Sequence, residues 1–366
     1  MSDPAAVSEP LLAASLYPWH QSLWQQLAGD QPKLDNFPHA LLLSGLAGSG
    51  KKALAAYLAQ TLMCHAPLPE PHNASLQPCQ QCRSCQLFNS GNHPDLYYLS
   101  TPEDKKIIPV VNVRDLIQWT VLSSQLLHKK VVIIEPADAM NQNAANSLLK
   151  TLEEPSANTV LILVTSKKQS LLPTIRSRCQ TLDIALPETA AARHWLQEQG
   201  IEQPELMLAL AASSPIKARD MADENAQAVR KMVLDSVLQI ASGSNEPVSA
   251  AERLFKLTSS KKTKTTRSKA GKNNVSASVS DIIYWLDSVW TDLARISQLQ
   301  ALIDARSFIS NLDYEQDLQQ LSNRLYLKKL LQLSDSVNKA YFEIQGSVNF
   351  NLLLEKLLIN WKDCLK

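Results

Sequence analysis

Apolar runs and amphipathic stretches alternate over the first half of the chain. Short continuous apolar runs predict buried strands, because strands of a parallel sheet that is covered on both faces have no polar side. Stretches with apolar residues three or four positions apart predict helices between them. The expected strands are residues 40–43, 96–99, 131–134, 160–164 and 182–184, and the expected helices are residues 17–27, 53–63, 113–127, 143–152 and 171–176. This alternation predicts an α/β domain with a parallel sheet over residues 1–185.

The pattern changes after Pro187, where the strand-like runs stop. Short helical stretches predict a small helical domain over residues 186–224, and longer ones predict an all-helical domain over residues 225–366. The expected helices are residues 188–199, 204–212, 216–221, 281–302, 314–344 and 349–365. Residues 259–280 carry six Lys and Arg residues and no acidic residue. This segment has too little apolar surface to order itself, so we expect a basic, disordered loop there.

The turn after the first expected strand is almost a P-loop. Gly45, Gly50 and Lys51 match the pattern G-x-x-x-x-G-K-[ST], and Gly48 adds a further glycine. Between a strand and a helix, such a loop cradles phosphates with backbone N–H groups and a helix N-terminus. The pattern fails at Lys52, where Ser or Thr would bind Mg²⁺, because an ammonium group has no lone pair to donate. The loop could bind ATP with little hydrolysis or not bind ATP at all, and the sequence leaves this open.

An acidic residue follows the expected strand 131–134, at the position where P-loop enzymes hold Mg²⁺. Glu135 could fill that role, but the next residue is Pro136, which offers neither an acid nor a base. The simpler interpretation is a buried strand that ends in a turn. Together with Lys52, this strand end predicts that the chain lacks groups that ATP hydrolysis needs.

Four of the six cysteines are clustered between two α/β elements. The spacing C-x14-C-x2-C-x2-C is formed by Cys64, Cys79, Cys82 and Cys85. Four thiolates complete the tetrahedral shell of a structural Zn²⁺ ion and leave no open position for catalysis. The alternative is a chance group of small buried thiols. Other ligand types nearby are His65, His72 and His93. Four cysteines already fill the shell, so we expect these histidines to lie outside it.

Composition bounds the class of protein. The chain has 366 residues, 45% of them hydrophobic, which is enough for two or three packed domains. Its net charge of +1 argues against a general binder of polyanions. No run of about 18 apolar residues predicts a membrane helix, and Asp3 and Glu9 are unlike the start of a secretory signal. We therefore expect a cytoplasmic protein without a membrane partner, in which the cysteines stay reduced.

The triplet Ser177-Arg178-Cys179 follows the short helix 171–176 at the expected edge of the α/β domain. A guanidinium group there could reach a phosphate on a neighbouring molecule, as an arginine finger does. On spacing alone, an Arg side chain that pairs locally is the more common case. The sequence therefore marks Arg178 as a candidate catalytic residue and leaves both interpretations open.

Taken together and in this order, the motifs resemble the delta-prime branch of the AAA+ clamp-loader family, which serves the bacterial DNA polymerase III. They are Gly45–Lys51, the four cysteines, His93-Pro94-Asp95, Leu148-Leu149-Lys150-Thr151-Leu152-Glu153-Glu154-Pro155 and Ser177-Arg178-Cys179. The resemblance is sharp over residues 15–185 and loose over the helical remainder. It implies a P-loop NTPase-like AAA+ domain with a zinc module at residues 64–85, followed by a small helical lid domain and an all-α collar domain.

The resemblance also implies a role. Clamp loaders are five-subunit rings that open a sliding clamp and place it on primed DNA. The expected partners are the gamma/tau and delta subunits, with the sliding clamp (beta) and primed DNA in the assembled complex. Delta-prime does not hydrolyse ATP itself. By resemblance, Arg178 acts in trans on ATP bound by the adjacent gamma/tau subunit, and Pro136 replaces an acid that would activate water.

Two other functions are weighed against this one. The first is an autonomous AAA+ ATPase motor of the gamma/tau type, which Lys52 and Pro136 disfavour. Such a motor would also carry an Arg near residue 216, where this chain has Lys217 and Arg219. The second is a zinc-dependent nucleic-acid binder, which the near-neutral charge disfavours because the basicity is confined to one loop. ATP turnover by the isolated chain separates the motor from the non-hydrolysing subunit.

Overall fold

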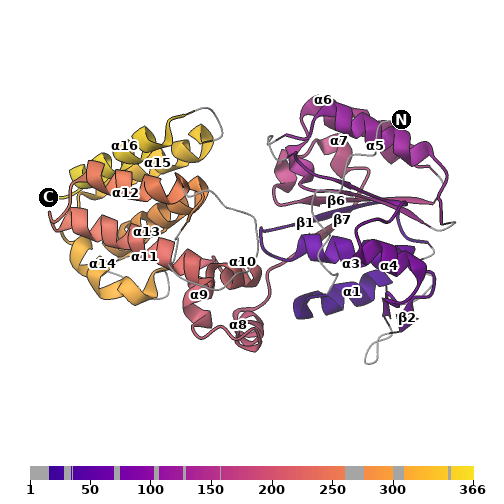
Figure 1. The fold of residues 1–366 in the computed structure, drawn as a ribbon, viewed down its shortest axis with the longest axis horizontal. Coiled ribbons are helices and arrows are strands. Elements are labelled where there is room, and N and C mark those ends of the chain that lie inside the picture. Colours follow the sequence, from indigo (N-terminus) through magenta and orange to yellow (C-terminus); the bar gives the residue numbers. More distant parts are fainter. Residues whose placement is uncertain are drawn as a thin grey trace. The chain divides into compact units, whose positions relative to one another are not determined.

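The computed structural model describes residues 16–28, 34, 36–69, 75–102, 107–126, 129–156, 158–259, 276–299, 309–344 and 348–366. The chain forms two compact units, Met1–Pro187 and Glu188–Lys366 (Figure 1). The first unit contains the parallel sheet, and the described part of the second unit contains helices. No described helix is both long enough and apolar enough to cross a membrane.

A five-stranded parallel sheet forms the centre of the first unit. Its strands, in the order β4-β5-β6-β1-β7, are β4 (Leu96–Leu99), β5 (Lys130–Ile134), β6 (Thr159–Thr165), β1 (Ala40–Gly45) and β7 (Gln180–Ile184). Every residue of β5 and β6 is buried. All five predicted strands are confirmed, and the central strands β5, β6 and β1 are continuous apolar runs because both faces of the sheet are covered there.

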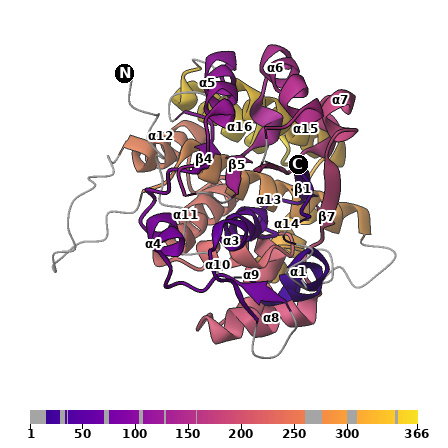
Figure 2. The same cartoon turned by 90° about the vertical axis from the view of Figure 1, so that its right-hand side faces the viewer.

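Helices cover both faces of this sheet (Figures 1 and 2). On one face α1 (Gln21–Ala28), α3 (Lys51–Met63) and α4 (Arg83–Asn89) pack on Leu41 and Leu43. On the other face α5 (Val110–Val121), α6 (Gln142–Glu153) and α7 (Pro173–Arg176) pack on Leu42. Neighbouring strand residues point to opposite faces, so one strand supplies both cores.

Short elements complete the first unit. They are the 3-10 turns η1 (Pro18–His20), η2 (Ala137–Ala139) and η3 (Lys168–Ser170) and the two-residue strands β2 (Leu68–Pro69) and β3 (Leu76–Gln77). Strands β2 and β3 pair antiparallel, and neither is among the strands that the apolar runs predicted. Residues 70–74, between these strands, lie outside the described part.

The predicted helix 113–127 is wrong at both ends, since α5 begins at Val110 and ends at Val121. The Lys130 ammonium donates to the carbonyls of Trp119 (2.6 Å) and Leu122 (2.7 Å) at the end of the helix. Just beyond, the Asp95 carboxylate accepts the N–H groups of residues 125 and 126. These long-range contacts use backbone groups that a longer helix would bond internally.

The second unit contains helices throughout its described part. They are α8 (Thr189–Glu198), α9 (Pro204–Leu210), α10 (Pro215–Met221), α11 (Glu224–Ala241), α12 (Pro247–Ser259), α13 (Val279–Leu299), α14 (Glu315–Ser322), α15 (Leu327–Glu343) and α16 (Phe350–Asp363), with the 3-10 turn η5 (Leu312–Tyr314). The predicted helical character of the C-terminal region is confirmed. The predicted boundary between lid and collar domains stays a prediction, and α10 contacts α11 within the unit.

One predicted helix is two helices. The single helix expected over residues 314–344 is interrupted between α14 and α15. There, Leu325 forms an antiparallel bridge with Leu365, and the Tyr326 N–H donates to the Cys364 carbonyl at 2.8 Å. Neither Gly nor Pro marks the break in the sequence. The C-terminal segment therefore ends α14 by competing for its backbone groups.

The predicted disordered loop 259–280 falls mostly outside the described residues, which omit 260–275. Its expected limits are wrong at both ends, because Ser259 belongs to α12 and residues 279 and 280 belong to α13. The non-helical segment is therefore shorter than the charge pattern indicated. The expected helix 281–302 likewise begins earlier, at Val279, and its residues 300–302 lie outside the described part.

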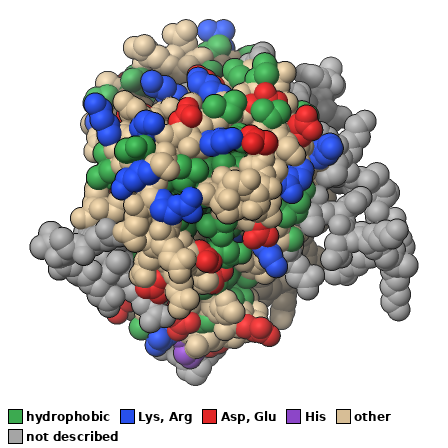
Figure 3. All heavy atoms as spheres, turned by 90° about the vertical axis from the view of Figure 1, so that its left-hand side faces the viewer, with side chains coloured by type: hydrophobic (Ala, Val, Ile, Leu, Met, Phe, Trp, Pro, Cys, Tyr) green, Lys and Arg blue, Asp and Glu red, His purple; other side chains and the backbone are tan. Residues whose placement is uncertain are grey.

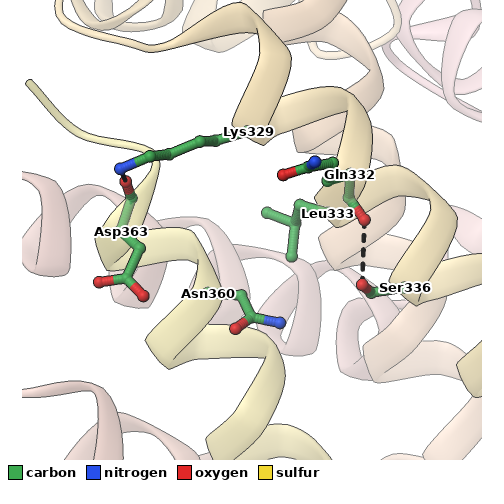
Figure 4. Close-up of a pocket in the computed structure, with 6 residues that line it drawn as sticks. All are labelled: Lys329, Gln332, Leu333, Ser336, Asn360 and Asp363. Carbon is green, nitrogen blue, oxygen red and sulfur yellow. Dashed lines mark hydrogen bonds between the residues drawn. The ribbon is translucent and has the colours of Figure 1, made fainter.

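A hollow of about 400 Å³ lies between α15 and α16 (Figure 4). It is lined by Lys329, Gln332, Leu333, Ser336, Asn360 and Asp363. The Lys329 ammonium donates to the Asp363 backbone carbonyl (2.8 Å), and the Ser336 hydroxyl donates to the Gln332 carbonyl (3.0 Å). Figure 3 shows a face on which Lys and Arg lie among acidic and apolar side chains. Within the described residues, the groups that could jointly hold a metal ion are the four cysteines of the first unit and not this hollow.

Candidate functional site

The fold brings the four cysteines together. Cys64 ends α3, Cys79 follows β3, Cys82 caps the N-terminus of α4 and Cys85 lies in its first turn. Their sulfur atoms all lie within 4.8 Å of one another, with Cys64 to Cys82 and Cys79 to Cys85 at 4.0 Å. Four sulfurs about 2.3 Å from a tetrahedral ion would be about 3.8 Å apart, so the cluster has room for one metal ion.

Backbone N–H groups point at these sulfurs. The amide of Cys79 donates to the Cys64 sulfur and the amide of Cys82 donates to the Cys79 sulfur, both at 3.3 Å. Burial raises the pKa of Cys64 to about 11 and also raises the pKa of Cys85. Burial likewise opposes ionisation of Cys79, but hydrogen bonds from the amides of Cys82 and Gln81 and from the side chains of Cys64 and Cys82 together outweigh it and lower the pKa of Cys79 to about 7. A bound cation would supply the charge that buried thiolates need.

His93 lies beside this cluster but is used by the fold. Its Nδ1 accepts the Asp95 N–H at 3.1 Å, so its Nε2 carries the proton and donates to the Ser84 hydroxyl at 2.8 Å. Ser84 in turn donates to the Met63 carbonyl at 2.7 Å. Both ring nitrogens are therefore occupied, which agrees with a shell of four cysteines. His72 lies outside the described residues.

The backbone conformation and the close packing of the P-loop explain why glycine stands at these positions. Gly50 precedes α3 with φ +90°, and Gly48 has φ +78°, both in the left-handed region that favours glycine. A Cβ atom on Gly45 would lie 2.2 Å from the Ile184 carbonyl oxygen of the neighbouring strand β7. The loop thus keeps the backbone shape that the sequence motif predicts.

The P-loop lysine turns back onto its own loop. Lys51 is buried, and its ammonium donates to the carbonyls of Gly45 (2.8 Å) and Leu46 (2.6 Å). Burial lowers the pKa of Lys51, while the negative charges of Glu135 and Asp138 act in the opposite direction. The Lys51 ammonium, which would contact a nucleotide phosphate, is thus bonded to two backbone oxygens.

An aromatic brace, which we define as Tyr17, Trp19 and His20, packs against the same loop. Tyr17 and Trp19 are stacked with ring centroids 4.8 Å apart. The Trp19 indole N–H (3.0 Å) and His20 Nε2 (2.8 Å) both contact the Ser49 carbonyl, which makes each nitrogen a donor. A Cβ on Gly50 would lie 2.7 Å from the rings of Tyr17 and His20. The sequence analysis missed the brace: three aromatic rings lie within four residues, but their spacing does not show what they pack against.

Lys52 puts a positive charge beside the acid at the end of β5. Its ammonium lies 3.9 Å from the Glu135 carboxylate and 5.6 Å from the centre of the Tyr98 ring. The Tyr98 hydroxyl donates to the same carboxylate. Pro136 follows Glu135 directly. A cation of the protein thus accompanies the one acid that the sequence offered for Mg²⁺.

Arg178 lies just after α7, at the boundary with β7. Its Nε donates to the Glu153 carboxylate at 2.8 Å, Nη2 contacts the same carboxylate, and Nη1 donates to the Thr174 carbonyl at 3.0 Å. The Arg178 side chain is 33% exposed and that of Glu153 is 49% exposed. The local pairing that spacing favoured is therefore present, and the guanidinium also reaches the surface.

Lys217 and Arg219, the basic residues near residue 216, both contact other residues of the helical unit. The Lys217 ammonium lies 3.7 Å from the centre of the Tyr284 ring on α13, and burial lowers the pKa of Lys217. Arg219 pairs with its neighbour Asp220 at 2.8 Å. The structure thus gives Lys217 a packing role, which a lysine fulfils through its ring contact.

Comparison with known proteins assigns the family. A profile described as DNA polymerase III, delta subunit matches residues 19–188, and one described as DNA polymerase III, delta subunit, C terminal matches residues 252–363. DNA polymerase III subunit delta′ of Pseudomonas aeruginosa is 42% identical over 231 residues, 62% of this chain and 67% of the relative. The delta′ subunit of Yersinia pestis is 32% identical over 359 residues, 95% of this chain and 96% of its own length.

A more distant relative is the DNA polymerase III subunit tau of Bacillus subtilis. It is 32% identical over 148 residues, 40% of this chain and 24% of the relative. The delta′ subunit of Yersinia pestis, by contrast, matches 95% of this chain at 32% identity. With its five-stranded parallel sheet, four-cysteine cluster and P-loop of altered chemistry, this chain belongs to the DNA polymerase III delta′ family.

Proposed function

We propose that this chain is a non-hydrolysing subunit of the DNA polymerase III clamp loader and supplies Arg178 in trans to ATP bound by a neighbouring subunit. The neighbour is of the gamma/tau type, the delta subunit completes the ring, and the assembly loads a sliding clamp on primed DNA in the cytoplasm. The observation that carries the proposal is a contrast within one unit. The Lys51 ammonium is buried and bonded to carbonyls of its own loop, whereas the Arg178 guanidinium is partly exposed at an edge.

The chemistry of the P-loop supports the absence of hydrolysis. An NTPase needs a hydroxyl ligand for Mg²⁺ in the loop and a carboxylate at the end of the neighbouring strand. This chain has Lys52 at the first position, and the ammonium lies beside Glu135, where it repels a second cation. Pro136 cannot take a proton from water. These groups favour a site that holds its own positive charge in place of a metal ion.

The chemistry of Arg178 supports a role in trans. An Arg side chain is charged at any physiological pH and has five N–H donors in a planar fork, which suits phosphate oxygens. A chain that does not hydrolyse ATP has no such use for the fork on its own nucleotide. The relation to a tau subunit gives the family context in which a nucleotide-binding neighbour would be found.

The four-cysteine cluster fits a structural Zn²⁺ ion. The sulfur spacing and the amide donors agree with a closed Cys₄ shell, in which the fourth cysteine fills the position that a catalytic site would leave open. Zn²⁺ would stabilise the ionised thiolates and cross-link the end of α3 to the start of α4. The cluster therefore supports the fold of the first unit and takes no part in ATP chemistry.

The test uses a loader reconstituted from gamma/tau, delta and this chain, with clamp and primed DNA. We expect Arg178→Ala to assemble normally and to lower ATP hydrolysis several-fold. A finger acting on a single site contributes about 10³–10⁵ in rate, but only one of several ATP sites loses it. Arg178→Lys should restore little, because an ammonium lacks the planar fork. Arg176→Ala is the control, since it removes the same charge two residues away.

A correctly assembled Arg178→Ala loader that hydrolyses ATP at the wild-type rate would end the proposal. The competing function, an autonomous motor, makes a different prediction for the isolated chain. Robust ATP turnover by that chain, abolished by Lys51→Ala, would favour the motor. We expect no ATP turnover above background for the isolated wild-type chain or for the isolated Lys51→Ala chain.

A further inference from the structure

We propose that Glu153 is the positioning residue of Arg178: its carboxylate orients the guanidinium so that the remaining N–H donors face outward for a phosphate of the neighbouring subunit. This inference rests on the proposed function, because it concerns how the finger is held. It also gives a purpose to the Leu148–Pro155 segment, whose acidic end no other part of the site uses. Glu153 acts through Arg178 and touches no nucleotide itself.

The contacts hold the fork on one side. The Glu153 carboxylate accepts from Nε at 2.8 Å and contacts Nη2, and the Thr174 carbonyl accepts from Nη1 at 3.0 Å. A guanidinium has five N–H donors, so three contacts leave two donors, on the terminal nitrogens Nη1 and Nη2. Those nitrogens form the end of the fork that pairs with two phosphate oxygens. Glu153 thus occupies the side of the guanidinium and leaves its end available.

The helix end that carries Glu153 is fixed by the core. Glu153 is the last residue of α6, whose Leu148 and Leu152 are fully buried against the sheet. His39 Nε2 donates to the Leu152 carbonyl at 3.0 Å and ties this helix end to the start of β1. The residues on either side of Arg178 are anchored as well, through buried Ile175 and Cys179. Two rigid elements therefore meet at one ion pair, which lowers the entropy lost when the fork is aligned.

The alternative is an ordinary surface ion pair. An exposed pair contributes little to stability, since solvent screens its charges. In that case removing the carboxylate would leave ATP hydrolysis unchanged. A third possibility is restraint by charge, in which Glu153 competes with the phosphate for Arg178, and removal of the carboxylate would then speed hydrolysis. The positioning role predicts the opposite, a slower reaction.

The experiment compares substitutions of Glu153 in the reconstituted loader with clamp and primed DNA. We expect Glu153→Ala to lower kcat for ATP two- to five-fold, between wild type and Arg178→Ala, with KM for ATP unchanged. Glu153→Gln keeps an oxygen that accepts from Nε and should retain most of the rate. Glu154→Gln is the matched control, because Glu154 is the adjacent, exposed residue and its substitution removes the same charge. A wild-type or faster rate for Glu153→Ala would overturn the inference.

A double substitution separates this inference from the proposed function. If Glu153 acts through Arg178, Glu153→Ala should have no further effect in a loader that already carries Arg178→Ala. A further loss of rate in that background would overturn the positioning role and leave the finger in place. If Arg178→Ala alone hydrolyses ATP at the wild-type rate, the proposed function fails and the inference fails with it.

Discussion

The P-loop and the arginine edge, which we define as Arg178 with its partner Glu153, are two cationic regions of one unit. They differ in how their charged groups are paired. Lys51 donates to two carbonyls of its own loop, and Lys52 lies beside Glu135. Arg178 pairs on one side only and is 33% exposed. The P-loop keeps its glycines and its helix, so its altered chemistry comes from side chains and not from loss of the loop.

The two regions contribute differently to the stability of the fold. The P-loop is braced from outside by Trp19 and His20 on the Ser49 carbonyl, and its lysine is buried. If the buried ammonium moved away, its carbonyl partners would be left without a hydrogen bond. This costs more free energy than a typical hydrogen bond contributes, so the ammonium is held in place. The arginine edge depends on an exposed ion pair, which contributes little to folding. Changes to the brace should therefore act on stability, and changes to the arginine edge on function.

Loss of the metal centre should have the largest effect on the stability side of this comparison. Cys82→Ser removes one thiolate of the shell and should lower the free energy of unfolding of the first unit by about 4 kcal/mol or more. For a unit of this size that corresponds to a fall in Tm of about 10 °C. Calorimetry together with metal analysis measures both quantities. Reduced protein that contains no metal, or Cys82→Ser protein with the wild-type metal content, would contradict the centre.

Hydrogen exchange then sharpens the same comparison. Cys64 ends α3, whose first residue is Lys51, and Cys82 begins α4. We expect metal loss to speed amide exchange in α3 and α4 and to leave α6 and α7 near Arg178 unchanged. Cys364→Ser, which alters a buried cysteine of the helical unit, is the control and should change neither region of the first unit.

Acid should weaken the brace by a smaller amount. Burial lowers the pKa of His20 from 6.5 to about 4, and its Nδ1 has no hydrogen-bond partner within the described residues. The unfolded chain therefore binds more protons than the folded chain between pH 6.5 and 4, so stability is full above pH 6.5 and falls as the pH drops toward 4. At pH 5 this amounts to about 1–2 kcal/mol.

A substitution isolates the contribution of this ring to the pH dependence. His20→Gln keeps an N–H donor for the Ser49 carbonyl and cannot titrate, so it should lose less stability between pH 7 and pH 5 than the wild type. His194→Gln changes an exposed histidine on α8 and should leave the pH dependence unchanged. Equal slopes of Tm against pH for His20→Gln and wild type would contradict the assignment.

The smallest expected effect on stability is that of Lys51→Ala. The substitution removes two hydrogen bonds and also removes the cost of burying an ammonium, so the two changes oppose each other. We expect the free energy of unfolding to change by less than about 1 kcal/mol, measured by denaturant titration of the chain. A loss of several kcal/mol would mean that the P-loop lysine is a main support of the fold.

The sequence predicted those features that local pattern encodes. Continuous apolar runs identified the strands, and the spacing of Cys64 to Cys85 identified the cluster, because thiol ligands close in sequence must meet around one ion. The brace was missed, since nothing in Tyr17–His20 shows that the rings will pack on Gly50. The same holds for the end of α5 at Val121. The contacts there come from Lys130 at the start of β5 and Asp95 just before β4. Such contacts depend on the tertiary fold and have no local signal.

One pair of substitutions tests the central claim most directly. Loaders are assembled with this chain carrying either Lys51→Ala or Arg178→Ala, and steady-state ATP hydrolysis is measured with clamp and primed DNA at equal subunit stoichiometry. We expect the wild-type rate for Lys51→Ala and a several-fold lower rate for Arg178→Ala. A lower rate for Lys51→Ala together with the wild-type rate for Arg178→Ala would contradict it, because hydrolysis would then occur at the chain's own P-loop.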